Sequence, residues 1–242
     1  RIFLSGTQAI VRLLLEQQRR DHRSGRNTAG FVSGYRGSPL GGLDTALWQA
    51  AKLLDAHRIH FEPGLNEEIA ATAVAGSQQT GIAGAARYQG VFGLWYAKNP
   101  GVDRAGDALK HGNAAGTSAL GGVLAFSGDD PGATSSSMPN QCDQAFASAL
   151  MPVISPATVQ EIIDFGLMGY ALSRYAGLWV GVKTVADVVE SSAVIAVEPD
   201  RPAIAYPENY ALPAGGLAIR LSESRWDQDA RLLEQRGAQR QP

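Results

Sequence analysis

A single cysteine, Cys142, is present among the 242 residues of the sequence. One thiol cannot close an internal disulfide, and an iron–sulfur cluster requires about four cysteine thiolates. This chain therefore forms neither by itself. Cysteine usage of this kind fits a reducing compartment, and we expect a cytoplasmic protein.

Long apolar runs and an excess of either charge are missing as well. No stretch reaches the roughly 18 to 20 apolar residues that cross a bilayer, and the N-terminus lacks the layout of a signal peptide, so we expect no membrane association. The 21 basic and 23 acidic residues nearly cancel, and no basic stripe with interleaved aromatics occurs, which argues against nucleic-acid binding. The sequence begins with Arg1 rather than methionine, which suggests a fragment of a longer protein.

Fingerprints of other common sites are also absent. No G-x-G-x-x-G follows the first apolar run and no G-x-x-x-x-G-K-[ST] occurs, which disfavours a simple dinucleotide-binding dehydrogenase and a P-loop protein. Asp107 and His111 have a spacing that can bind metal, but no third ligand is near, so we interpret them as a hydrogen-bonded pair and expect no metal site in this chain. Without a G-x-S-x-G elbow, the serines at 135–137 are interpreted as hydrogen-bond donors of a loop.

Short apolar runs alternate with helical segments along most of the chain. The runs expected to be strands are residues 29–33, 59–62, 90–97, 122–127, 152–155 and 178–183. The segments expected to be helices are residues 5–25, 43–56, 65–80, 102–113, 141–150 and 159–175. This alternation is typical of βαβ units, so we predict an α/β fold with a parallel six-stranded sheet and helices on both faces.

Residues 1–200 are predicted to form this domain, and residues 201–242 an exit linker and a charged helix. The linker is expected because the sequence becomes rich in proline after about residue 198. The helix is expected to be solvated because residues 222–241 are heavily charged. We expect this segment to lead toward a downstream domain outside the sequence.

Ligands of parallel α/β sheets bind at the carboxyl ends of the strands. The loops expected at those ends span residues 35–42, 63–66, 98–107 and 128–140, and they are the glycine-rich, polar segments of the chain. We therefore predict one composite site at this edge of the sheet.

The segment from 60 to 79 breaks at a Pro-Gly pair and opens a helix with two carboxylates, Glu67 and Glu68, in its first turn. Asn66 is expected to be the N-cap, and acidic residues just after a cap are favoured by the helix dipole. Residues 69–76 carry no charge, so we expect this helix to be buried on most sides. A carboxylate that is desolvated there could act as a general acid or base, although spacing alone favours the structural role.

Four motifs resemble, in the same order, the N-terminal pyrimidine-binding domain of the 2-oxoacid:ferredoxin oxidoreductases. They are Y-R-G-S-P-L-G-G at 35–42, E-P-G-L-N-E-E at 62–68, N-P-G-V-D-R-A-G-D-A-L-K-H-G-N at 99–113 and S-G-D-D-P-G at 127–132. The resemblance covers roughly residues 3–235 and is most specific to the fused, single-chain indolepyruvate ferredoxin oxidoreductases of aerobic bacteria. It implies oxidative decarboxylation of a 2-oxoacid such as indolepyruvate.

The resemblance also implies thiamine diphosphate, bound between a pyrimidine domain and a separate diphosphate domain. Asn66 and Glu67 match the Asn-Glu pair of the family. Glu67 is thereby implied as the catalytic carboxylate, which hydrogen-bonds the aminopyrimidine of the cofactor and promotes loss of the thiazolium C2 proton. Glu68 is assigned to the start of the helix.

Two loops supply the other contacts that the resemblance implies. Ser38 matches a Thr or Ser position that contacts substrate and cofactor. Gly37 would allow close approach of the backbone to the cofactor, and Pro39 would stiffen the turn, with turn chemistry alone as the alternative for both. Ser136 and Ser137 lie where the family shapes its substrate pocket.

Several parts of the family's machinery lie outside this sequence. The G-D-D at 128–130 is not the G-D-G segment that holds magnesium and the diphosphate, and cluster cysteines are absent. We expect magnesium and 4Fe-4S clusters only in the full-length protein, on diphosphate-binding and iron–sulfur domains of the same or another chain. Further expected partners are a ferredoxin-type electron acceptor and a second copy in a homodimer. Asp107, His111 and Asn113 match the family, with loop positioning or domain contact as their expected role.

Two alternatives stay open. One is a non-catalytic α/β binding or assembly module that kept the fold, and the role of Glu67 distinguishes it from an enzyme. The other is the pyrimidine domain of another thiamine enzyme class, such as a relative of acetolactate synthase, which needs no clusters. Cluster cysteines and a G-D-G segment in the sequence beyond residue 242 would favour the ferredoxin type.

Overall fold

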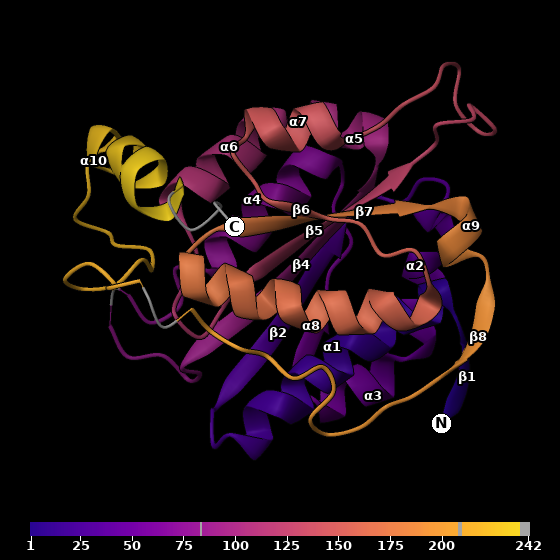
Figure 1. Ribbon diagram of the computed structural model, residues 1–242, viewed down its shortest axis with the longest axis horizontal. Coiled ribbons are helices and arrows are strands. Elements are labelled where there is room, and N and C mark those ends of the chain that lie inside the picture. Colours follow the sequence, from indigo (N-terminus) through magenta and orange to yellow (C-terminus); the bar gives the residue numbers. More distant parts are fainter. Residues whose placement is uncertain (83, 208–209, 238–242) are drawn as a thin grey trace.

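A six-stranded parallel sheet forms the centre of the computed structural model, which describes residues 1–82, 84–207 and 210–237 (Figure 1). Its strands are β2 (Thr28–Gly34), β3 (Ile59–Phe61), β4 (Gly90–Lys98), β5 (Val123–Asp129), β6 (Val153–Ile154) and β7 (Trp179–Val185). They lie in the order β3-β2-β4-β5-β7-β6, and neighbouring strands are parallel. The predicted fold class and the six predicted strands are confirmed.

Helices cover both faces of this sheet (Figure 1). One face carries α1 (Gly6–Arg23), α2 (Leu43–Gln49) and α8 (Val159–Ala176), and the other carries α4 (Glu67–Ser77), α6 (Gly106–Ala115) and α7 (Asp143–Ser148). The shorter elements are η1 (Leu40–Gly42), α3 (Ala51–Ala56), α5 (Asn99–Arg104), α9 (Ala186–Val189), α10 (Arg225–Ala230) and η2 (Arg231–Arg236). Within the described residues, none of the helices has the length and apolar character needed to cross a membrane.

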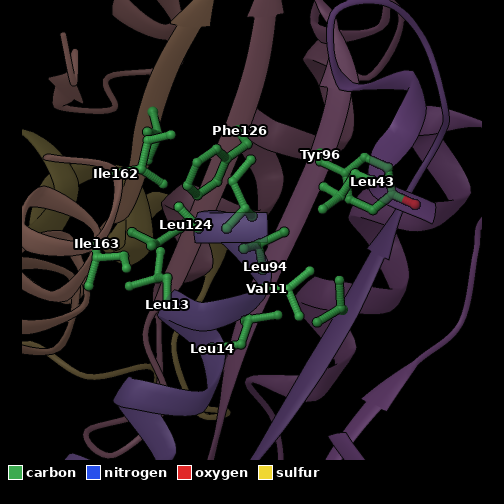
Figure 2. Packing of buried hydrophobic residues seen from close by; sticks show 14 of the residues in the cluster. Val11, Leu13, Leu14, Leu43, Leu94, Tyr96, Leu124, Phe126, Ile162 and Ile163 are labelled. Carbon is green, nitrogen blue, oxygen red and sulfur yellow. The ribbon is translucent and has the colours of Figure 1, made fainter. Parts of the chain in front are cut away.

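Alternation along β4 divides the core into two layers. Leu94 and Tyr96 pack with α1 and α8, while Trp95 and Ala97 pack with α4 and α6 on the opposite face. Figure 2 shows the first layer, where side chains of α1, β4, β5 and α8 meet. Successive residues of a strand point to opposite faces, so a strand buried on both sides is apolar at nearly every position.

Three sequence predictions about the helices are wrong in detail. The helix predicted at 43–56 is divided at Ala50 into α2 and α3, and the one predicted at 102–113 begins at Asn99 and is interrupted at Ala105. A glycine directly follows the second interruption, and glycine is a weak helix former. The helix α4 is not buried on most sides, because Ile69 and the preceding Leu65 are exposed on its outer face.

A short antiparallel ribbon was missed by the sequence analysis. It pairs β1 (Ile2–Ser5) with β8 (Ser192–Ile195), so that Ile2 lies opposite Ile195. The expected capping box at Ser5 and Gln8 is present and opens α1 directly after β1. The ribbon therefore joins the start of the chain to the segment that follows β7.

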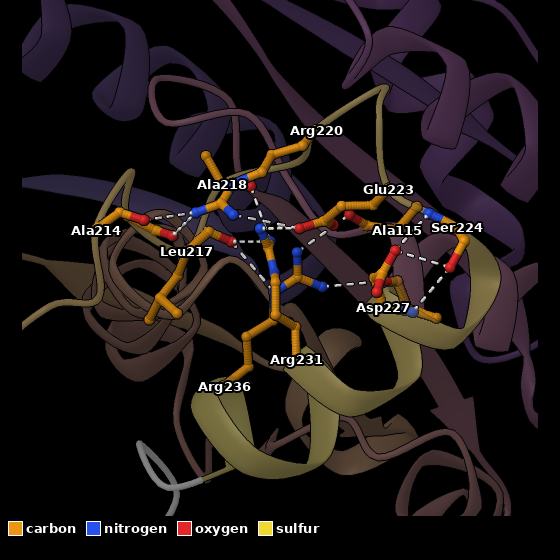
Figure 3. Close-up of polar contacts among 12 residues, drawn as sticks. Ala115, Ala214, Leu217, Ala218, Arg220, Glu223, Ser224, Asp227, Arg231 and Arg236 are labelled. Atoms are coloured by element: carbon orange, nitrogen blue, oxygen red, sulfur yellow. Dashed lines mark hydrogen bonds and ion pairs between the residues drawn. The ribbon is translucent and has the colours of Figure 1, made fainter.

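The charged segment near the C-terminus is only partly solvated: α10 has no buried residue, whereas Arg231, Leu232 and Arg236 of η2 are buried (Figure 3). Arg236 is fully buried, and its guanidinium donates hydrogen bonds to the carbonyls of Ala114 and Ala115 at 2.7 and 3.1 Å. These belong to the last turn of α6, where carbonyl groups lack partners within the helix. Burial lowers the pKa of Arg236 to about 10. The part of the predicted helix from 238 to 241 lies outside the described residues, and the domain boundary at 200 stays a prediction.

Candidate functional site

The loops that follow β2, β3, β4 and β5 meet at the carboxyl edge of the sheet, as the topology requires. The amide of Gly64 donates to the carbonyl of Gly34 at 2.9 Å, which joins the loop after β3 to the end of β2. The ammonium of Lys98, at the end of β4, donates to the carbonyl of Ser135 at 2.7 Å, in the loop after β5. The predicted composite edge is therefore built from contacts between these loops.

Glu67 is the first residue of α4 and lies at this edge with 8% of its surface exposed. Asn66 is the N-cap, since its side chain accepts a hydrogen bond from the amide of Ile69 at 2.8 Å. The indole of Trp95 donates to the backbone carbonyl of Glu67 at 2.9 Å and ties the helix start to β4. Glu68, the next residue, is exposed. Two adjacent glutamates thus occupy opposite environments.

The carboxylate of Glu67 is enclosed by the segment that follows β4. A Cβ placed on Gly101 would lie 2.6 Å from Glu67 Cγ and 2.8 Å from its Oε1, so only glycine fits there without displacing the glutamate. Arg104 Nε lies 3.7 Å from Glu67 Oε2, but its side chain is 71% exposed, and exposed ion pairs contribute little. In the part of the chain that the structure describes, no group donates a hydrogen bond to this carboxylate. Its acceptor capacity is therefore open to a ligand.

The loop that contains Ser38 reaches the same edge from β2. A Cβ on Gly37 would lie 2.7 Å from the Cβ of Lys98, and a Cβ on Gly128 would lie 2.7 Å from Cδ of the buried Pro39. Ser38 itself is exposed, and its hydroxyl makes no hydrogen bond to another described residue. The glycines allow this loop to pack against β4 and β5 while the serine hydroxyl stays accessible.

The loop after β5 that contains Ser135, Ser136 and Ser137, called the serine loop below, is organised around Asp130. Its carboxylate accepts hydrogen bonds from the amides of Thr134 and Ser135, both at 2.8 Å. The hydrogen bond from the amide of Ser135 is the largest cause that lowers the pKa of Asp130 to about 2. Ser136 is half-buried within this turn and Ser137 is exposed. Asp130 was not among the site residues predicted from the sequence, although an aspartate in a Pro-Gly turn followed by Thr and Ser is a signal for such a motif.

Asp129, the residue before Asp130, is buried and supports the serine loop through hydrogen bonds. It accepts hydrogen bonds from Ser127 Oγ at 2.7 Å, from the amide of Cys142 at 2.9 Å and from Asn99 Nδ2 at 3.3 Å. Lys183 Nζ lies 3.8 Å from it. Burial, with Asp129 nearby, raises the pKa of the Cys142 thiol. Asp129 therefore has a structural role, and its oxygens are engaged by the protein.

The residues near the end of the third motif lie apart from this edge. Asp107 and His111 form an exposed pair on α6, with His111 Nε2 3.6 Å from Asp107 Oδ1. Asn113 is buried, donates to the carbonyl of Ala149 at 2.8 Å and accepts from the amide of Trp179 at 2.9 Å. It joins α6 to β7 and to the turn after α7. Among the described residues, no cluster of three or more His, Cys, Asp or Glu could bind a metal ion.

No protein-family model matches the chain. The IorA subunits of indolepyruvate oxidoreductase from Methanothermobacter thermautotrophicus and Methanothermobacter marburgensis are 27% and 28% identical to it over 197 and 195 residues. The IorA subunit from Archaeoglobus fulgidus is 27% identical over 200 residues. Each match covers 81% of this chain and 28% of the relative, so the chain spans little more than a quarter of the length of these proteins.

A solved structure shares the fold. It is the 2-oxoglutarate:ferredoxin oxidoreductase from Magnetococcus marinus with 2-oxoglutarate, coenzyme A and succinyl-CoA bound, which superposes with a TM-score of 0.63 and 14% identity. The match covers 98% of this chain and 44% of that chain. The resemblance inferred from the four motifs is confirmed: the chain is similar to a segment of the IorA subunits of indolepyruvate oxidoreductase and has the fold of a 2-oxoacid:ferredoxin oxidoreductase.

Proposed function

We propose that this chain is the pyrimidine-binding half of a thiamine diphosphate-dependent 2-oxoacid oxidoreductase of the indolepyruvate type, with Glu67 as its catalytic carboxylate. The observation that carries the proposal is the position of Glu67, which is buried at the carboxyl edge of the sheet with no hydrogen-bond donor among the described residues. A buried acceptor is costly unless a partner satisfies it. A ligand donor at this position would supply that partner.

The chemistry of Glu67 and its surroundings fits an aminopyrimidine. A carboxylate can accept a hydrogen bond from a protonated ring nitrogen, and the low exposure of Glu67 would strengthen such a bond. Gly101 leaves the space in which the carboxylate lies, and Ser38 presents an accessible hydroxyl from the neighbouring loop. When bound, thiamine diphosphate supplies the carbanion-stabilising chemistry for decarboxylation of a 2-oxoacid. In this chain, Glu67 would bind the pyrimidine, orient it and hold a proton at its ring nitrogen.

The rest of the proposed machinery belongs to other parts of the enzyme. The chain matches 28% of the IorA relatives and 44% of the structural neighbour. We infer that a diphosphate-binding domain with magnesium, and iron–sulfur domains that pass electrons to a ferredoxin-type acceptor, come from the same full-length protein or from another chain. The proposed substrate is indolepyruvate or a related 2-oxoacid, in a cytoplasmic homodimer.

The test is Glu67→Gln in the complete enzyme, with Glu68→Gln as a matched control. Both changes remove one negative charge from the first turn of α4, so they have similar effects on the interaction with the helix dipole. Glu67→Gln should lower kcat by about two to four orders of magnitude, which is typical for the loss of a proton-transfer group, while Glu68→Gln should stay within about twofold of the wild type. Near-normal turnover by Glu67→Gln with indolepyruvate would refute the proposed role.

A further inference from the structure

Lys98 is the last residue of β4 and occupies the point where two predicted substrate loops meet. Its stem lies against Gly37, since a Cβ on that glycine would be 2.7 Å from Lys98 Cβ. Its ammonium donates to the carbonyl and the hydroxyl of Ser135, at 2.7 and 3.3 Å. Lys98 therefore connects the Ser38 loop to the serine loop, although the sequence analysis did not select it.

The position of Lys98 relative to Glu67 follows from the alternation of the strand. Ala97 packs on the α4 face of the sheet, where a Cβ on Gly101 would meet both Ala97 Cβ at 2.9 Å and the Glu67 side chain. Lys98 is the next residue, so its side chain lies on the opposite face, with the Ser38 loop. A carboxylate and an ammonium thus flank the tip of β4.

Lys98 has no carboxylate within ion-pair distance among the described residues, and Asp130 is linked to it only through the Ser135 hydroxyl. Lys183, another lysine near this edge, has two carboxylate partners: Asp143 at 2.6 Å and Asp129 at 3.8 Å. Lys98 forms no ion pair with a described residue, and its contacts with Ser135 are to neutral oxygens. An ammonium has three donors, so this geometry leaves donor capacity and a full positive charge for an anionic ligand.

We propose that Lys98 binds the carboxylate of the 2-oxoacid substrate and thereby selects for acids over uncharged carbonyl compounds. The inference rests on the proposed function, because it assumes that a 2-oxoacid binds at the carboxyl edge. An ammonium–carboxylate contact is a charge-assisted hydrogen bond, stronger than one between neutral groups. Because Lys98 also contacts Ser135, binding of the acid would change the hydrogen bonds between Lys98 and the serine loop.

The test compares Lys98→Gln and Lys98→Arg in the complete enzyme, with Lys110→Gln as a control on the exposed side of α6. Glutamine keeps a donor for the Ser135 carbonyl but removes the charge, so it separates substrate binding from loop support. Lys98→Gln should raise KM for indolepyruvate by roughly tenfold or more, as expected for loss of a hydrogen bond to a charged group, with kcat within about threefold. Lys98→Arg should keep most of the affinity, and Lys110→Gln should match the wild type.

The primary amide of indolepyruvate, used as a competitive inhibitor, provides the readout that a purely structural role would not change. Its inhibition constant should be the same in Lys98→Gln and in the wild type, because it carries no carboxylate. In the wild type, added salt should raise KM for the acid without changing the inhibition constant of the amide. The inference would be overturned if Lys98→Gln left KM for indolepyruvate unchanged, or if it weakened binding of the acid and of the amide equally. A change in the thiamine diphosphate requirement of Lys98→Gln, without a change in KM, would also overturn it.

Failure of the proposed function would be visible in the wild type and in Glu67→Gln, not in the Lys98 variants. It would show as a wild-type enzyme without indolepyruvate-dependent acceptor reduction, or as full activity of Glu67→Gln. Failure of the Lys98 inference would show only in the Lys98 variants of an enzyme that is active and depends on Glu67. The two outcomes are therefore distinguishable.

Discussion

Replacement of Gly101 by alanine tests the geometry of the site without touching a charged group. The new Cβ would lie 2.6 Å from Glu67 Cγ and 2.8 Å from its Oε1. Carbon contacts are normally at about 3.5 Å or more, so the carboxylate must retreat by about 1 Å. If Glu67 is the catalytic carboxylate, a displacement of that size should lower kcat on the order of a hundredfold, or about 2.7 kcal/mol in activation free energy.

The effect on stability should be smaller than the effect on catalysis. Overpacking costs about 1 to 3 kcal/mol, whereas alanine in a helix is about 1 kcal/mol more favourable than glycine. The free energy of unfolding should therefore fall by about 0 to 2 kcal/mol. Gly106→Ala is the matched control, because a Cβ on Gly106, in the next helix, meets no atom within 4 Å. It should leave kcat unchanged and slightly raise the melting temperature.

The assay is steady-state oxidation of indolepyruvate by the complete enzyme with an artificial electron acceptor, together with thermal unfolding of each variant. The reasoning would be refuted if Gly101→Ala kept kcat within about twofold of the wild type. It would also be refuted if Gly106→Ala lost as much activity as Gly101→Ala, since the loss would then reflect helix chemistry and not the space beside Glu67.

Two further predictions concern stability. Arg174 forms a buried pair with Asp21 at 2.6 Å, and Arg174→Met would leave the Asp21 carboxylate with Gln17, Thr28 and the more distant Arg26. This change should lower the free energy of unfolding in urea by about 3 kcal/mol, because a buried charge loses its closest ionic partner. Arg201→Met, at the more exposed pair with Asp164, should cost about 1 kcal/mol or less, and equal losses would contradict the burial argument. The low pKa of Asp130, about 2 against an ordinary 3.8, means that its ionised form stabilises the folded state above about pH 4 and that this stabilisation disappears between about pH 4 and pH 2. The melting temperatures of the wild type and Asp130→Asn should therefore converge over that range, and a constant difference would disprove the assignment.

The sequence predicted the sheet well because each strand is a short apolar run bounded by turn residues, and burial on both faces demands such a run. The division at Ala50 was not predictable, because alanine favours helix and no glycine or proline lies beside it. The division at Ala105 had a local signal in Gly106, which the prediction did not use. The ribbon of β1 with β8 joins residues far apart in the chain, and nothing local marks that pairing.

Residues of the candidate site were predictable from the sequence only where a local sequence pattern marked them. Glu67 follows an N-cap asparagine at a helix start, so spacing placed it at the correct edge. Lys98 lies in no motif of its own, and its significance comes from contacts with Gly37 and Ser135, which are distant in sequence. Asp130 belongs to the motif S-G-D-D-P-G, but its hydrogen bonds with the amides of Thr134 and Ser135 depend on how the loop folds.

Arg236 closes the last turn of α6, and α6 leads into the amino end of β5. The described C-terminal segment is thus anchored at the rim of the sheet opposite the one that holds Glu67 and Lys98 (Figures 1 and 3). The contacts of the C-terminal segment and the edge that carries Glu67 therefore lie at separate ends of the sheet. Substitutions around Arg236 should change the stability of the chain without altering the shape of the Glu67 edge.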